Sequence, residues 1–191
     1  MLDRWNICDR IAEGFCLGAG IEIGAFSQPV NTPGKTTYVD RVNDMSMFYP
    51  NRKEENKIIP DVIDNGESLT KFEDNSQDYV ITRHVFEHFK NPLMALHNWD
   101  RVLKKNGIIY MTVPDKRYMF DSGHETTEYF HLKVDKAMRY ESDMTSADQH
   151  EHFFDQCLLL EILRNFMQEY GYNLEFSYTK EVDITFILRK L

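Results

Sequence analysis

The stretch GIEIGA at residues 20–25 decides the fold, because a short β-rich run ends there at Gly24. A glycine after a strand permits a tight turn and lets backbone N–H groups approach a ligand closely. Asp40 follows about sixteen residues later, at the end of the β-rich run 36–39. A carboxylate there can accept both hydroxyls of a ribose, although acidic residues also end strands as solvated loop starts. The spacing therefore favours a nucleoside-binding turn, with a solvated strand end as the alternative.

Further along the chain, β-rich runs alternate with amphipathic helical patterns. Pro60 in the third run indicates an edge strand, because proline cannot donate to a sheet. Strands that alternate with helices predict an α/β fold: a Rossmann-like, doubly wound, mostly parallel sheet with a C-terminal antiparallel hairpin. Ligands of such sheets bind beyond the carboxyl ends of the strands. The expected strands are 21–23, 36–39, 57–63, 79–82, 107–113, 173–178 and 182–189, and the expected helices are 3–16, 92–103 and 154–170.

Length and composition bound the class of protein. The 191 residues fit one domain, with a helix within residues 1–17 and a polar segment, 115–150, that we expect to cover a substrate. A formal charge of −9 disfavours nucleic acid as a partner. No apolar run reaches the length of a membrane span, and residues 1–6 do not resemble a secretory signal. Three cysteines without a pattern indicate reduced thiols in the core of a cytoplasmic protein.

Five segments in order carry a family resemblance: residues 20–25, 38–41, 78–88, 101–107 and 113–121. Together they resemble a class I S-adenosylmethionine-dependent methyltransferase. The closest likeness is to small methyltransferase-domain proteins of bacterial surface-polysaccharide synthesis. The resemblance implies S-adenosyl-L-methionine as the cofactor. It also implies methyl transfer to a hydroxyl, and less readily a nitrogen, of a small polar acceptor such as a sugar or glycan precursor.

The resemblance also implies roles for the residues that follow the strands. Glu22, Gly24 and Ala25 are expected to form the loop under the methionine part of the cofactor, and Asp40 is expected to bind the ribose. Asp64 and Asn65 are expected near the adenine, and Arg83 and His84 beside the reactive methyl group. One residue departs from the family pattern. Phe26 stands where many members carry a second glycine, which puts cofactor affinity in question and leaves a non-catalytic binding module as an alternative.

Histidines and neighbouring charges supply candidates for the acceptor side. Histidine suits a general base because its ordinary pKa lies near neutrality. The candidate bases are His152, His150 and Asp115, and the candidate substrate contacts are His88, Lys116 and Arg117. Lys116 and Arg117 could bind a phosphate.

Residues 84–88 also spell H-x-x-E-H, the inverted zinc-protease pattern, which leaves a zinc hydrolase as a remote alternative. That pattern belongs on an extended helix, whereas here it begins at the end of a predicted strand. In a second alternative, Glu87 and His88 only cap and solvate a helix start. We therefore expect no metal, and the sequence does not give the oligomeric state.

Overall fold

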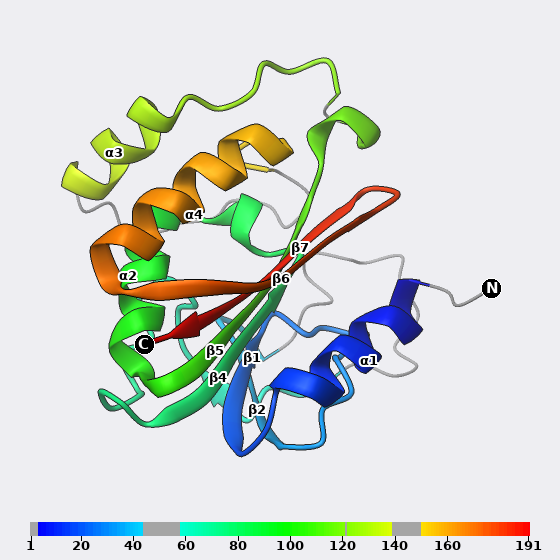
Figure 1. Cartoon of the computed structure of the whole chain (residues 1–191), viewed down its shortest axis with the longest axis vertical. Helices are drawn as coiled ribbons and strands as arrows, with labels where there is room; N and C mark the ends of the chain where they lie inside the picture. The colour runs from blue at the N-terminus through cyan, green and yellow to red at the C-terminus, as the bar shows by residue number, and fades with distance from the viewer. Residues whose placement is uncertain (1–3, 44–57, 121, 139–149) are drawn as a thin grey trace.

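The computed structural model describes residues 4–43, 58–120, 122–138 and 150–191 (Figure 1). The strands of these residues are β1 (Ala19–Ile23), β2 (Lys35–Asp40), β3 (Val62–Ile63), β4 (Gln77–Arg83), β5 (Leu103–Pro114), β6 (Tyr172–Lys180) and β7 (Asp183–Lys190). They form one seven-stranded sheet in the order β3-β2-β1-β4-β5-β7-β6. The pairs among β1 to β5 are parallel, and β7 pairs antiparallel with β5 and with β6. The predicted mostly parallel sheet with a C-terminal hairpin is confirmed.

Helices cover the two faces of the sheet (Figure 1). On one face Cys8 and Ala12 of α1 (Arg4–Phe15), with Cys16 just after it, are buried against Tyr79 and Ile81. The opposite face carries α2 (Pro92–Val102), α3 (Tyr129–Met138) and α4 (Gln156–Tyr170), which share a second, larger core. The parallel strands therefore have their faces covered, and their carboxyl ends are the place for polar side chains.

Capping residues set the ends of α2 and α4: α2 begins and α4 ends where predicted, whereas α4 begins at Gln156, two residues later than predicted. Asn91 Oδ1 accepts a hydrogen bond from Met94 N at 3.1 Å, and Pro92 occupies the first helical position, where proline is tolerated. Asp155 Oδ1 accepts from Leu158 N at 2.9 Å at the start of α4. Gly171, at φ +73°, ends α4 in the left-handed conformation that glycine adopts easily.

Two strand predictions were wrong in their bounds. No loop separates α2 from β5: the strand begins at Leu103, which pairs with Gln77, and the ladder then shifts register. Asn106 lies in this stretch at φ +64°, a conformation that asparagine tolerates, so the strand includes the residues between the predicted helix 92–103 and the predicted strand 107–113. The third strand is only Val62–Ile63, because Pro60 cannot join the ladder, and it lies at the sheet edge as predicted. Lys57 of the predicted run lies outside the described residues.

The segment 115–150 contains more regular structure than its polar sequence indicates. It begins with a short 3₁₀ helix, η3 (Lys116–Tyr118), and includes α3. Among residues 129–134 of α3, Leu132 is fully buried while Phe130 is exposed, so the helical period of apolar residues is weak there. Residues 121 and 139–149 of the predicted covering segment lie outside the described part.

Two further sequence predictions concern composition. No helix among the described residues combines the length and apolar character that a membrane crossing requires. Cys8 and Cys16 are buried as predicted, whereas Cys157 is exposed on α4 and is not a core residue. Its position on a solvent-facing turn of an amphipathic helix explains the difference.

Candidate active site

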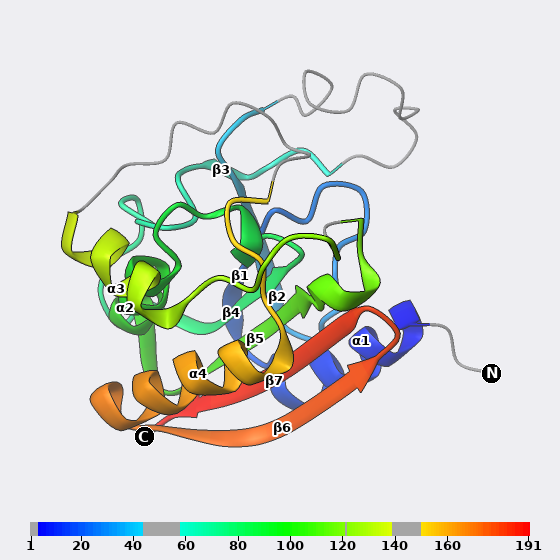
Figure 2. The ribbon, with the colours of Figure 1, turned by 90° about the horizontal axis from the view of Figure 1, so that it is seen from above.

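The carboxyl ends of β2, β1 and β4 lie side by side, and the loops that follow them carry most of the predicted site residues. Figure 2 looks onto this end of the sheet. The turn after β1 depends on Gly24, which adopts φ +67°. A Cβ at this position would lie 2.5 Å from Val85 Cγ2, in the loop after β4. Only glycine therefore allows the loops after β1 and β4 to approach this closely.

Two residues after Gly24, Phe26 also adopts a left-handed backbone, at φ +48°. The backbone thus keeps the shape that a glycine favours at this position, although the side chain is a phenylalanine. Phe26 O accepts a hydrogen bond from Ile58 N at 2.6 Å, and Ala25 O accepts one from Gln28 N at 3.0 Å. The loop is therefore closed by its own backbone.

Glu22 lies beneath this loop and is 1% exposed. Both carboxylate oxygens accept a hydrogen bond from Val30 N at 3.1 Å. Burial raises the pKa of Glu22 to about 8, against the opposing effects of Val30 N–H and the charge of Arg83. Arg83 itself donates from Nη2 to Gln28 O at 2.8 Å. Both side chains therefore brace the loop from residue 24 to residue 30.

Asp40 ends β2 at the same edge. Its Oδ1 accepts a hydrogen bond from Arg41 N at 2.7 Å. Burial raises the pKa of Asp40 above its ordinary value, and the backbone N–H groups of Arg41 and Val42 and the charge of Arg41 reduce that effect. A half-buried carboxylate at this position suits a ligand that offers hydroxyl donors.

Asp64 and Asn65 open the next loop, and their side chains bind that loop. Asp64 accepts from Asn65 N, Thr70 Oγ1 and Lys71 N at 2.8–3.0 Å. Asn65 Oδ1 accepts from Glu67 N at 2.8 Å. Their side-chain oxygens thus already have partners within the loop, which the sequence did not indicate.

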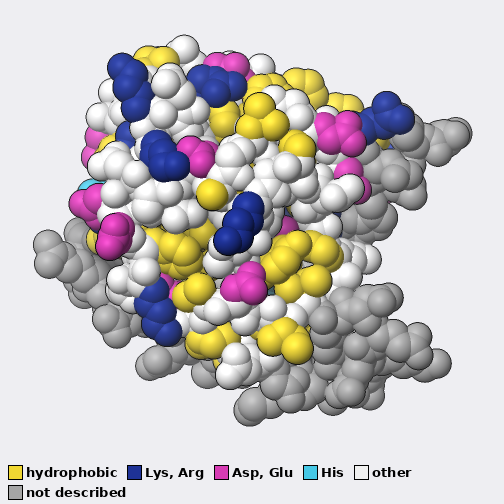
Figure 3. Space-filling view, turned by 90° about the horizontal axis from the view of Figure 1, so that it is seen from below, with side chains coloured by type: hydrophobic (Ala, Val, Ile, Leu, Met, Phe, Trp, Pro, Cys, Tyr) yellow, Lys and Arg dark blue, Asp and Glu magenta, His cyan; other side chains and the backbone are white. Residues whose placement is uncertain are grey.

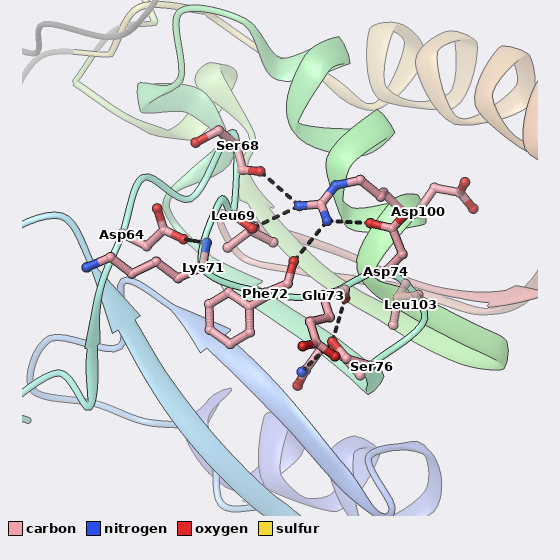
Figure 4. A network of polar contacts seen from close by, with 12 residues as sticks. Asp64, Ser68, Leu69, Lys71, Phe72, Glu73, Asp74, Ser76, Asp100 and Leu103 are labelled. Atoms are coloured by element: carbon pink, nitrogen blue, oxygen red, sulfur yellow. Dashed lines mark hydrogen bonds and ion pairs between the residues drawn. The ribbon is translucent and has the colours of Figure 1, made fainter.

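A single guanidinium holds the far side of this loop. Figure 4 shows it between Ser68, Leu69, Phe72 and Asp74. Arg101, on α2, donates to the carbonyls of these first three residues at 2.8–3.3 Å and pairs with Asp74 at 2.7 Å. The loop after β3 is therefore held in place beside the strand ends by these hydrogen bonds.

Beyond β4 the chain turns through His84, at φ +53°, into the 3₁₀ helix η2 (Phe86–His88). His84 Nε2 lies 2.7 Å from Asp183 Oδ1, and its Nδ1 lies 3.9 Å from Glu87 Oε1. The H-x-x-E-H segment is thus a strand end and a single 3₁₀ turn. It does not have the long helix of the zinc-protease pattern.

The two predicted bases of the H-x-H motif lie in different surroundings. The His150 ring packs edge-on against His88, with centroids 4.8 Å apart. His152 is 3% exposed; its Nε2 lies 3.3 Å from Lys90 O, and its ring is 5.8 Å from that of His131. Of the pair, His150 therefore adjoins the loop after β4, whereas His152 is part of the interior.

Asp115 follows β5 and is held by its neighbour. Arg117 donates to both carboxylate oxygens, with Nη2 2.6 Å from Oδ2 and Nε 2.9 Å from Oδ1. Burial would raise the pKa of Asp115, but the hydrogen bonds and charge of Arg117 outweigh it and lower the pKa. A lowered pKa makes Asp115 a weaker base. Lys116 Nζ donates to His124 O.

One alternative from the sequence, in which Glu87 only caps or solvates a helix start, does not agree with the structure. Glu87 is 1% exposed, and neither carboxylate oxygen has a hydrogen-bond partner among the described residues. Its backbone oxygen accepts from Glu151 N and His152 N at 2.9 and 3.1 Å, which brings the segment before α4 over it. The only signal in the sequence was its position between the apolar Phe86 and His88.

Comparisons with known proteins agree with this architecture. A family model described as a methyltransferase domain matches residues 15–111, just over half of the chain. A search of curated proteins gave no significant match.

Several solved structures share the fold. An S-adenosylmethionine-dependent methyltransferase from Mesorhizobium loti superimposes with a TM-score of 0.60 at 11% identity, covering 97% of each chain. One from Thermotoga maritima, described as a possible histamine N-methyltransferase, gives 0.58 at 18% identity, covering 98% of this chain and 94% of that chain. One from Aquifex aeolicus gives 0.57 at 13%, covering 96% and 89%.

Proposed function

We propose that this chain, which belongs to the methyltransferase domain family, transfers a methyl group to a hydroxyl of a small polar acceptor. Membership of the family makes it an S-adenosylmethionine-dependent methyltransferase. The acceptor we propose is a sugar or a surface-polysaccharide precursor, handled in the cytoplasm. The observation that carries the proposal is the meeting, at one end of the sheet, of the Gly24 turn and Asp40 with several imidazoles.

Two features of the chain fit the cofactor. The Gly24 turn lacks the Cβ that would strike Val85, so backbone N–H groups can approach a bound methionine moiety. Asp40 offers a half-buried carboxylate for the ribose hydroxyls. Glu22 and Arg83 hold this loop in shape, together with Ala25. We propose that Asp64 and Asn65 shape the adenine pocket through the backbone of their loop.

The bound cofactor supplies an activated methyl group on a sulfonium, so the protein's task is to align the acceptor and receive its proton. His84 is the base we favour, because Asp183 holds its Nε2 and orients Nδ1 toward the space beside Glu87. Such an acid–imidazole pair fixes the tautomer of a base. His88 and His150 line the same space, and Lys116 and Arg117 suit an anionic group of the acceptor.

Product analysis tests this proposal. The enzyme is incubated with S-adenosylmethionine and a panel of sugar phosphates, nucleotide sugars and amines, histamine included, and products are identified by mass spectrometry. We expect methyl ethers of a hydroxyl acceptor. His84→Ala should lower the rate roughly 10²–10⁴-fold, as expected for loss of a general base, while His97→Ala, on the exposed side of α2, should not. Methylation of amines alone would overturn the acceptor class.

A further inference from the structure

Glu87, His88 and His150 form a compact group of metal-binding side chains, which we call the Glu–His–His cluster. Each offers one ligand atom, and these atoms all lie within 4.8 Å of one another. A tetrahedral zinc site with bonds of about 2.0–2.2 Å needs ligand atoms roughly 3.3 Å apart. Small side-chain rotations would close the cluster to that size.

The second observation is the state of the Glu87 carboxylate. It is buried, and the structure gives neither oxygen a hydrogen-bond partner within the described residues. Burying an ionised carboxylate without partners is strongly unfavourable. The nearest imidazole nitrogens, on His84 and His88, lie 3.9 and 3.8 Å from Oε1, beyond hydrogen-bond distance. A cation bound among these groups would compensate the charge of the carboxylate.

The backbone brings the three ligands together from distant parts of the chain. Glu87 O accepts hydrogen bonds from Glu151 N and His152 N, which fixes the segment carrying His150 above η2. In Figure 2 this yellow segment crosses the carboxyl end of the sheet on its way into α4. His150 is further packed between His88 and Phe120, with ring centroids 4.8 and 5.0 Å away. Positioning through backbone bonds and ring packing is what a metal site requires of its surroundings.

We propose that the Glu–His–His cluster binds one divalent transition-metal ion, most readily Zn²⁺ or Mn²⁺, and that the ion coordinates the acceptor hydroxyl. Two imidazoles and one carboxylate are a donor set that such ions favour and that leaves coordination positions open. The sequence did not predict this ligand set, because the zinc-protease pattern at residues 84–88 pairs His88 with His84, whereas His150 lies sixty-two residues after His88.

The chemical consequence rests on the proposed methyl transfer. A metal lowers the pKa of a bound hydroxyl and so makes it a better nucleophile near neutral pH. The hydroxyl proton passes to His84 Nδ1, the oxygen lone pair forms the new O–C bond, and the C–S electron pair stays on sulfur, which becomes a neutral thioether. His84 is available for the proton because it is outside the ligand set and is held by Asp183. Val85 follows His84 in the chain and contacts the Gly24 turn. The proposed cofactor loop and the Glu–His–His cluster are therefore neighbours.

Metal binding can be measured without activity. The purified chain is stripped with a chelator and titrated calorimetrically with Zn²⁺ and with Mn²⁺, and Co²⁺ is added as a visible-absorption probe. We expect one ion per chain, and at least about tenfold weaker binding in Glu87→Gln and in His150→Ala. His97→Ala is the matched control and should bind as the wild type does. Circular dichroism checks that each variant is folded. If Glu87→Gln does not fold, His150→Ala still tests the metal site.

The outcomes separate this inference from the proposed function. Absence of binding at millimolar metal, or equal binding in both variants and the wild type, would overturn the metal site. A stripped enzyme that keeps full methyl transfer would overturn the role of the ion in the reaction. Titration of the stripped chain with S-adenosylmethionine tests the proposed function separately from the metal site. We expect the cofactor to bind whether or not the chain binds metal.

Discussion

A carboxylate lies near each end of strand β4, Asp78 within the strand and Glu87 in the turn after it, and the two have opposite surroundings. Near its amino end, Asp78 accepts from Ala19 N at 2.8 Å and pairs with Lys104 Nζ at 2.8 Å. Burial would raise the pKa of Asp78, but Lys104 and the Ala19 N–H outweigh it and lower the pKa. Just past its carboxyl end, Glu87 is buried and makes no hydrogen bond through its carboxylate to the described part of the chain.

The backbone shows the same contrast. At the amino end, left-handed positions are occupied by Asn75 and Asn106, at φ +53° and +64°. Asparagine tolerates this conformation. At the carboxyl end Phe26 adopts it at φ +48°, which costs a bulky side chain more.

The amino end is thus organised for stability. Figure 3 looks onto this end and shows acidic and basic side chains mixed among apolar ones. The carboxyl end instead has the Glu87 carboxylate without a hydrogen bond to the described residues, raised pKa values at Glu22 and Asp40 and a strained turn. Unfavourable features concentrated in one place are typical of binding and catalytic sites. Substitutions at the two ends should therefore have different consequences.

The largest effect is expected from Gly24→Val. A β-branched residue at φ +67° is strained, and its Cβ would strike Val85, so the loops after β1 and β4 must separate. We expect cofactor affinity to fall about 100-fold or more in a calorimetric titration. Gly14→Ala is the control: a Cβ there meets nothing within 4 Å, in α1. It should raise stability by about 0.5–1 kcal/mol and leave binding unchanged. Equal binding losses in both variants would contradict the comparison.

The second effect is a pH dependence of stability. Burial raises the pKa of Glu22 to about 8 and that of Glu67 to about 7, from 4.5. The folded state therefore holds these protons after the unfolded state has released them. The free energy of unfolding should fall by roughly a few kcal/mol as the pH rises from about 5 to 8.

Urea denaturation at pH 5 and pH 8 measures this dependence. Glu22→Gln keeps an oxygen acceptor for Val30 N and removes the titrating group. Its stability should fall less over that range than the stability of the wild type. Asp78→Asn is the matched change at the amino end. In Asp78→Asn the free energy of unfolding should fall between pH 5 and pH 8 by as much as in the wild type. Identical pH profiles for wild type and Glu22→Gln would contradict the buried, protonated carboxyl.

The third effect separates binding from stability. Asp40→Ala should weaken S-adenosylmethionine binding by about 1.5–3 kcal/mol per lost charged hydrogen bond, with little change in the melting temperature. Asp78→Ala should do the opposite: a stability loss below about 1 kcal/mol, since the pair with Lys104 is partly exposed, and no change in binding. Unchanged binding in Asp40→Ala would make this residue a solvated strand end.

The smallest effect is expected from Phe26→Gly. Glycine relieves left-handed strain of about 1–2 kcal/mol, and its extra freedom in the unfolded chain offsets about 0.5–1 kcal/mol of that gain. Stability should change by less than about 1 kcal/mol, while cofactor affinity should rise a few-fold as the loop gains room. A marked loss of affinity would mean that the phenyl ring itself contacts the cofactor.

Local signals in the sequence were enough to predict the fold, whereas the residues of the cofactor side stay a prediction. The cap at Asn91, the stop at Gly171 and the glycine after β1 each act through their immediate neighbours. The acceptor side depends on contacts across the chain. Glu87 is buried by a segment some sixty residues later, and Asp64 is engaged by a loop that closes on Arg101. No periodicity or spacing encodes such contacts.

The central claim is that ligand binding occurs at the carboxyl ends of the parallel strands. Hydrogen–deuterium exchange with and without saturating S-adenosylmethionine tests it most directly. The account predicts increased protection in peptides covering residues 22–30, 38–43 and 83–88, and no change in those covering residues 75–78 and 103–107 at the amino end. Protection at the amino end, or at neither end while calorimetry shows saturation, would contradict it.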